Sequence, residues 1–252
     1  MSEEKKYLRM SKNERIQHFL LLISFIVLVI TGFWLKFPEA WWVKWIVYII
    51  GENAFEARSI IHRVASVVLI VASVYHLMYI SFSDRGRKLV KDFLPRKSDI
   101  SEFTGSMKYL TGKSEIKPRF GRFSYIEKME YWAVVWGTVI MGLTGFVLWF
   151  KDFFFKYISN TGMDIATAIH YYEAILASLA ILVWHFYFIF MNPDVAPMNK
   201  AWLSGYLTRE EMENEHPREL EEQEKMEEPE VPEMPESPSE SEKSEESEKS
   251  KD

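Results

Sequence analysis

The chain has 252 residues, of which 48% are hydrophobic and 15% aromatic, and its formal net charge is −6. It contains no Cys, which excludes disulfide bonds, iron–sulfur clusters held by thiolates, c-type haem attachment and thiol nucleophiles. Residues 1–191 hold 23 Lys and Arg against 16 Asp and Glu, whereas residues 192–252 hold 7 against 20. This division is typical of a membrane-embedded body with a solvated acidic tail, and no nucleic-acid partner is expected.

Four apolar stretches are long enough to cross a membrane, which takes about 20 residues. They are residues 16–35, 59–82, 129–150 and 166–190. Trp and Tyr gather near their ends, as in an interfacial belt. We therefore predict an all-α fold, an integral membrane four-helix bundle of the cytoplasmic membrane in contact with lipid, formed by residues 1–205.

Lys and Arg are concentrated in two segments outside the spans. Five precede the first span and twelve lie in residues 83–128, against three and two in the other loops. The positive-inside rule therefore places the N-terminus, the long middle loop and the C-terminus in the cytoplasm. The apolar segment "EAWWVKWIVYII" (residues 39–50) is too short to cross and is expected to lie flat in the outer interface.

The last part of the chain, residues 206–252, is acidic, rich in Ser and Pro and poor in aromatic residues. Such a composition buries too little apolar surface to fold alone. We predict a cytoplasmic tail that is largely disordered, from about Pro217 onward. It either only solvates the protein or docks on a basic partner.

The first and third spans end alike, in "LVITGFWLKF" and "IMGLTGFVLWF". Two interpretations of the shared TGFxLxF pattern are open. The small residues pack helices together, or Gly32 and Gly145 leave room for a flat ligand between helices.

Five of the six histidines lie in or beside the spans: His18, His62, His76, His170 and His185. Ionisable side chains at membrane depth are costly and are functional candidates by default. On a regular helix, His170 and His185 share one face within about 60° and are about 22 Å apart. His62 and His76 share a face within about 40° and are about 21 Å apart. With the predicted orientation, His62 and His170 form an outer layer, and His76, His185 and His18 form an inner one.

Paired imidazoles at two depths favour two haems, each held between helices. Zinc or other divalent sites would normally add Asp, Glu or Cys ligands, and a proton relay would need carboxylates along the path. Haem propionates could pair with Arg63 and Arg58, which flank His62. A histidine-lined transporter of metal ions or protons, and a non-redox anchor protein, are the alternatives.

The chain resembles the four-helix b-type cytochromes. This family includes the gamma subunits of membrane formate dehydrogenases, the cytochrome b subunits of nickel–iron hydrogenases and bacterial cytochrome b561. The resemblance rests on "ERIQHFLLLISFIVLVITGF", "ARSIIHRVASVVL", "FSYIEKMEYWAVVWGTVIMGLTGFVLWF" and "IHYYEAILASLAILVWHFYFIFMNPDVAPMN". It covers roughly residues 8–205 and is most specific in the placement of the histidines.

The resemblance implies two non-covalent b-type haems. The outer haem would lie between His62 and His170, and the inner one between His18 and His185. The family needs no histidine at position 76. Because His76 and His185 lie at similar depth, the inner pair is left open between His18–His185 and His76–His185.

The resemblance also implies a subunit that moves electrons between the quinone pool and a partner redox subunit of a respiratory chain. The partner, an iron–sulfur or multihaem protein, would carry the chemistry on any soluble substrate. A quinone site is implied near the start of the third span, where Glu127 and Glu130 could carry protons. An ion pair with Lys128 is the alternative for these carboxylates. Glu173 either orients His170, leads protons outward or bonds a neighbouring helix.

Overall fold

The computed structural model describes residues 5–195 and 197–227. The long helices are α1 (Lys12–Lys36), α3 (Ala54–Phe82), α6 (Tyr125–Trp149) and α8 (Asn160–Leu179), the last continued by the π-helices η1 (Ala180–His185) and η2 (Tyr187–Met191). The shorter elements are β1 (Lys6–Leu8), α2 (Trp41–Ile50), α4 (Asp84–Phe93), α5 (Lys97–Leu110), α7 (Lys151–Phe154), η3 (Pro193–Val195), α9 (Ala201–Ser204), β2 (Tyr206–Thr208), α10 (Arg209–Glu215) and α11 (Pro217–Glu227). Four helices have the length and composition of membrane spans, so the predicted all-α membrane bundle is confirmed.

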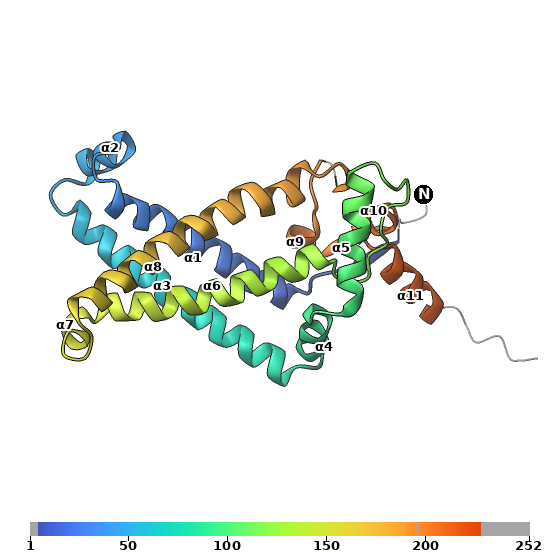
Figure 1. Ribbon diagram of the computed structural model, residues 1–252, viewed down its shortest axis with the longest axis horizontal. Coiled ribbons are helices and arrows are strands. Elements are labelled where there is room, and N and C mark those ends of the chain that lie inside the picture. The colour runs from blue at the N-terminus through green and yellow to red at the C-terminus, as the bar shows by residue number, and fades with distance from the viewer. Residues whose placement is uncertain (1–4, 196, 228–252) are drawn as a thin grey trace, which may run out of the picture. The chain divides into compact units, whose positions relative to one another are not determined.

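The spans pack as two close pairs (Figure 1). α1 lies along α3, α6 lies along α8, and α1 also contacts α8. The buried positions of α3 are all alanines, Ala54, Ala65 and Ala72, and such small side chains let neighbouring membrane helices approach closely. Most large apolar side chains on the spans are exposed, as expected where the solvent is lipid.

Each spanning helix begins four to six residues before the apolar run that predicted it. Side-chain caps explain the difference at α1, α6 and α8. The side chain of Ser11 accepts a hydrogen bond from the Glu14 amide at the start of α1, and Ser124 and Glu127 form the same capping box at the start of α6. A capping box satisfies amides that the helix leaves unpaired. The helix can therefore begin among polar residues that precede the apolar run.

Helix α2 has one buried and one exposed side. Val43 is fully buried in a cluster with Trp34 and Ala54, whereas Trp41 and Tyr48 are more than 80% exposed. The segment is thus an amphipathic helix of 10 residues docked on the ends of α1 and α3.

The tail is ordered as far as residue 227, beyond Pro217, where the predicted disorder begins. Strand β2 pairs antiparallel with β1, with Tyr7 opposite Leu207, and a small core is formed by Tyr7, Ala201, Leu207, Met212 and Leu220. We call this cluster the β1–β2 core. The tail folds here because the N-terminal segment supplies the apolar surface that the tail lacks by itself. The rest of the predicted disordered tail, 228–252, lies outside the described residues.

Candidate cofactor site

Two histidines from different helix pairs face each other. The rings of His62 on α3 and His170 on α8 have centroids 6.5 Å apart and planes inclined by 65°. The Nδ1 atom of His62 lies 2.8 Å from the hydroxyl of Thr31 on α1. The Nδ1 atom of His170 lies 2.9 Å from the hydroxyl of Thr144 on α6.

The threonine bonds determine which ring nitrogens carry hydrogen. The Thr31 hydroxyl donates to the Val27 carbonyl at 2.6 Å, and the Thr144 hydroxyl donates to the Ile140 carbonyl at 2.7 Å. A hydroxyl has only one hydrogen, so each threonine oxygen accepts a bond from an imidazole Nδ1–H. Nε2 then keeps its lone pair in both rings and is the atom able to bind a metal.

The two glycines of the TGF repeat lie against these same rings. A Cβ at Gly145 would lie 3.2 Å from Cε1 of His170, and a Cβ at Gly32 would lie 3.8 Å from Cε1 of His62. In each span, therefore, the threonine bonds the histidine and the adjacent glycine leaves space for its ring.

A second group of histidines lies toward the other end of the bundle. Nδ1 of His185 lies 3.1 Å from Oε2 of Glu130 on α6. His18 and His185 lie close enough for charges on their rings to interact. Nδ1 of His18 is buried and has no hydrogen-bond partner in the described part of the chain. The His18 ring lies 6.2 Å, between centroids, from that of Trp202.

His76 differs because both of its ring nitrogens are engaged. Nδ1 lies 2.7 Å from Oε1 of Gln17 on α1. Nε2 lies 3.1 Å from the hydroxyl of Tyr131 on α6. His76 thus links three helices by hydrogen bonds. Within residues 5–195 and 197–227, no three His, Cys, Asp or Glu side chains gather as a metal-binding group.

Unpaired buried donors lie beside both histidine groups. Nε of Arg58, one turn from His62, and Nε1 of Trp34, one turn from Thr31, have no partner among the described residues. Beside His18, Nε of Arg15 and Nε1 of Trp202 are buried without a partner in the same described ranges. Unsatisfied buried donors are costly, so these atoms indicate places where acceptor groups could bind.

Arg63 and Glu173 have other surroundings. The Arg63 guanidinium lies over the Trp149 ring, 5.3 Å from its centroid. Oε1 of Glu173 lies 3.0 Å from the position of a Cβ at Gly137 on α6. Glu173 thus occupies the contact between α6 and α8, while the Nδ1 of His170 bonds Thr144.

The carboxylates at the start of α6 have different partners. Glu127 accepts bonds from the amide of Ser124 at 2.7 Å and from its hydroxyl at 2.9 Å. Lys128 pairs with Asp99 at 2.6 Å, and Glu127 lies 3.8 Å from the guanidinium of Arg9, so this helix end is ion-paired, though with other partners than expected. Oε1 of Glu130 is buried and has no partner among the residues that the structure describes.

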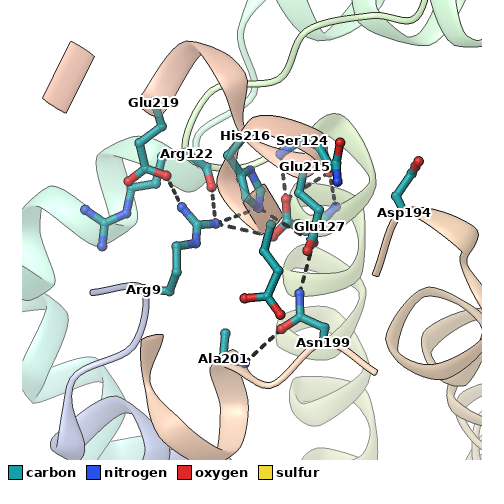
Figure 2. Close-up of polar contacts among 12 residues, drawn as sticks. Arg9, Arg122, Ser124, Glu127, Asp194, Asn199, Ala201, Glu215, His216 and Glu219 are labelled. Atoms are coloured by element: carbon teal, nitrogen blue, oxygen red, sulfur yellow. Dashed lines mark hydrogen bonds and ion pairs between the residues drawn. The ribbon is translucent and has the colours of Figure 1, made fainter. Parts of the chain in front are cut away.

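A buried polar network beside the start of α6 was not predicted from the sequence (Figure 2). Arg9 donates to the Arg122 carbonyl at 2.6 Å and to Nε2 of His216 at 3.0 Å, and it pairs with Glu219. His216 donates from Nδ1 to the Gly121 carbonyl at 2.9 Å. Burial lowers the pKa of His216, which keeps the ring neutral and Nε2 free to accept. No signal in the sequence could have located this network, because its partners lie between 95 and 210 positions apart in the chain.

Glu215 in this network is expected to make stability depend on pH. Burial, followed by the charge of Glu127, raises its pKa from 4.5 to about 7. A raised pKa means that the folded state holds the proton more tightly than the unfolded chain. The stability from this group is therefore full below pH 4.5 and is lost as the pH rises through 7, by roughly 3 kcal/mol.

We therefore expect Glu215→Gln to stabilise the β1–β2 core at pH 8 and to change it little at pH 5. Hydrogen–deuterium exchange of residues 206–216, compared with the parent at each pH, measures this. Glu213→Gln on the same helix is the matched control, since the Glu213 side chain is 55% exposed. A slower exchange in Glu215→Gln at both pH values would contradict the assigned pKa.

Four spanning helices, with histidines of α3 and of α8 facing each other between them, form a histidine-bearing membrane bundle. This is the architecture of membrane cytochromes b. The sequence profile of the prokaryotic cytochrome b561 family matches residues 9–198, and the chain belongs to this family. It is a multi-pass protein of the bacterial inner membrane that transfers electrons and binds b-type haem.

Several relatives are similar over most of their length. The formate dehydrogenase cytochrome b556 subunit of Haemophilus influenzae is 26% identical over 218 residues, 86% of this chain and 84% of the relative. The nitrate-inducible formate dehydrogenase cytochrome b556(Fdn) subunit of Escherichia coli K12 is 24% identical, with 86% and 92% covered. The formate dehydrogenase cytochrome b556(fdo) subunit of the same strain is 20% identical, with 86% and 93% covered.

The residues present fit a b-type haem. Imidazole–metal bonds are about 2.0–2.1 Å long, so two imidazoles that share one metal through Nε2 have centroids roughly 6 Å apart. The 6.5 Å between His62 and His170 fits this separation. The Nε of Arg58, which has no partner among the described residues, is a suitable donor for a haem carboxylate.

Proposed function

We propose that this cytochrome binds two b-type haems and passes electrons between the quinone pool and a partner redox subunit. The observation that carries the proposal is the placement of histidine groups from different helix pairs at two levels of the bundle. When bound, each haem supplies a one-electron iron couple whose potential depends on its axial ligands and burial.

The first haem is assigned to His62 and His170. The facing rings, their separation of 6.5 Å and the Nε2 lone pairs left by the threonine bonds all support this pair. Arg58 is the favoured partner for a propionate because its Nε is buried without an acceptor among residues 5–195 and 197–227. Arg63 lies on the same helix and is a second candidate, although its guanidinium already contacts Trp149.

The second haem is assigned to His18 and His185. The Nδ1–H of His185 points to Glu130, which leaves Nε2 for the metal, and such a carboxylate partner makes the ligand more basic. His76 is the weaker candidate, because its two nitrogens already bond Gln17 and Tyr131. Arg15 and Trp202 supply donors beside His18 that have no partner in the described part of the chain and could bond propionates.

A quinone site is proposed beside the second haem, at the start of α6. Quinone reduction takes up two protons with two electrons, so the site needs protonatable groups. One carboxylate oxygen of Glu130 bonds Nδ1 of His185. The other is buried and has no partner in the described ranges. Glu127 lies 3.8 Å from the guanidinium of Arg9 in the buried network. Glu173 is the candidate for proton movement at the other level of the bundle.

The partner subunit is proposed from the relatives. They are named as cytochrome subunits of formate dehydrogenases, so the oxidation of a soluble substrate takes place in another polypeptide of such complexes. We propose an iron–sulfur or multihaem partner on the outer face, with the N-terminus and the C-terminal tail in the cytoplasm.

The test is a dithionite-reduced minus oxidised spectrum of the purified protein, together with the haem-to-protein ratio. We expect b-type bands, two haems per chain, and reduction of the haems by a quinol. Absence of b-type bands would overturn the cytochrome function and favour a histidine-lined transporter. A ratio of one would overturn the di-haem proposal alone.

Gly145→Ala is expected to weaken retention of the first haem more than Gly32→Ala. A Cβ at Gly145 would lie 3.2 Å from the His170 ring, so the ring must move by a few tenths of an ångström, whereas 3.8 Å at Gly32 is ordinary contact. Such overpacking costs roughly 1–3 kcal/mol. Haem content after purification measures the effect. Equal losses in the two variants would contradict this explanation.

A further inference from the structure

We propose that Thr31 and Thr144 are positioning residues that set the tautomer and the ring planes of His62 and His170, and thereby tune the haem held between them. The inference rests on the proposed function, because it assumes that these two histidines are the ligands. It deepens that function by assigning a role to the repeated threonines.

The two threonines occupy equivalent places. Thr31 on α1 bonds His62 on α3, and Thr144 on α6 bonds His170 on α8. Each bond therefore joins the two helices of one closely packed pair. Each threonine precedes a glycine whose missing side chain leaves space for the same ring. The TGF repeat thus forms two matching cradles, one for each imidazole.

The hydroxyls act in one direction only. Each threonine hydrogen is committed to a backbone carbonyl, Val27 for Thr31 and Ile140 for Thr144. The oxygens can therefore serve only as acceptors for the imidazole Nδ1–H. This holds both rings in the tautomer with Nε2 free, and it ties the direction of each ring to a rigid helix backbone.

The partners at the second group of histidines are different. His185 bonds the carboxylate of Glu130, and Nδ1 of His18 has no partner within the described residues. The acceptor on Nδ1 controls how basic a ligating imidazole is. Neutral hydroxyls on both rings therefore give the first haem a ligand field that the second does not share.

The experiment compares Thr31→Val and Thr144→Val with Thr31→Ser and Thr144→Ser in the full-length protein. Valine keeps the size of threonine but removes the acceptor, whereas serine keeps the hydroxyl. The matched control is Thr167→Val on α8. The Thr167 hydroxyl donates to the Met163 carbonyl at 2.9 Å, the same backbone bond, and has no histidine partner in the part of the chain that the structure describes.

We expect the valine variants to raise the midpoint potential of one haem and to shift its low-spin electron paramagnetic resonance signal. The ligand becomes less basic and its plane is no longer held. The serine variants and Thr167→Val should keep the parent values, and the second haem should be unchanged in all of them.

Parent-like potential and resonance signal in both valine variants would overturn the inference. So would serine variants that change as much as valine, because packing and not the hydroxyl would then be responsible. A valine variant that loses the haem while its serine counterpart keeps it supports the inference. A parent protein without b-type bands would sink the proposed function itself, and the parent spectrum is recorded first for that reason.

Discussion

Replacing His170 by alanine is expected to leave one haem per chain in place of two. His62→Ala is expected to remove the same haem. The reason is that these imidazoles are the proposed ligands of one haem: their rings have centroids 6.5 Å apart and their Nδ1 atoms are turned to threonines. If the two histidines hold one haem, as proposed, either substitution would remove one of its two ligands.

The double variant His62→Ala/His170→Ala should also keep one haem, because residues that act on one site are not additive. The haem-to-protein ratio and the reduced-minus-oxidised spectrum of the remaining haem measure this. Tyr172→Ala is the control, since this side chain is two residues from His170 but 67% exposed. Loss of both haems in the double variant, or different remaining spectra in the single variants, would show that the two histidines do not share a haem.

The four spans could be predicted from the sequence because a long apolar run in lipid has only one stable conformation, a helix. An apolar run of about 20 residues must satisfy its own backbone, and a helix does so. The helix starts could not be predicted from hydropathy alone, since Ser11 and Ser124 extend α1 and α6 through side-chain capping.

The folded part of the tail could not be predicted because composition describes a segment by itself. Leu207 and Met212 are almost fully buried, yet a partner in their core is Tyr7, about 200 positions earlier in the chain. Hydrophobic spacing within the tail does not reveal a partner at that distance.

Spacing along a helix also had limited value for the histidines. The angular argument for His170 and His185 assumed a regular α-helix, but η1 and η2 are π-helical, with His185 at the end of η1. A π-helical segment has wider turns, so every later side chain points in a different direction from the one a regular α-helix would give it. Likewise, only the packed structure reveals that Gln17 and Tyr131 occupy both nitrogens of His76.

Three alanine variants are expected to show whether His18 or His76 holds the second proposed haem together with His185. His18→Ala and His185→Ala should each lose the same haem, whereas His76→Ala should keep two. His76 bonds Gln17 and Tyr131 through both nitrogens, so Nε2 has no free lone pair for a metal unless the bond from Tyr131 breaks. In contrast, the buried Nδ1 of His18 has no hydrogen-bond partner among the described residues.

The measurement is again the haem-to-protein ratio, with the remaining spectrum as an internal control of folding. If the bundle is intact, the haem proposed to lie between His62 and His170 should keep its bands in all three variants. Two haems in His18→Ala, with one in His76→Ala and one in His185→Ala, would reverse the assignment. In that case Tyr131 must rotate away from His76 when haem binds, and Tyr131→Phe would bind the second haem at least as well as the parent. If His18 is the ligand, Tyr131→Phe instead removes only a bond that holds His76, and both haems stay in place.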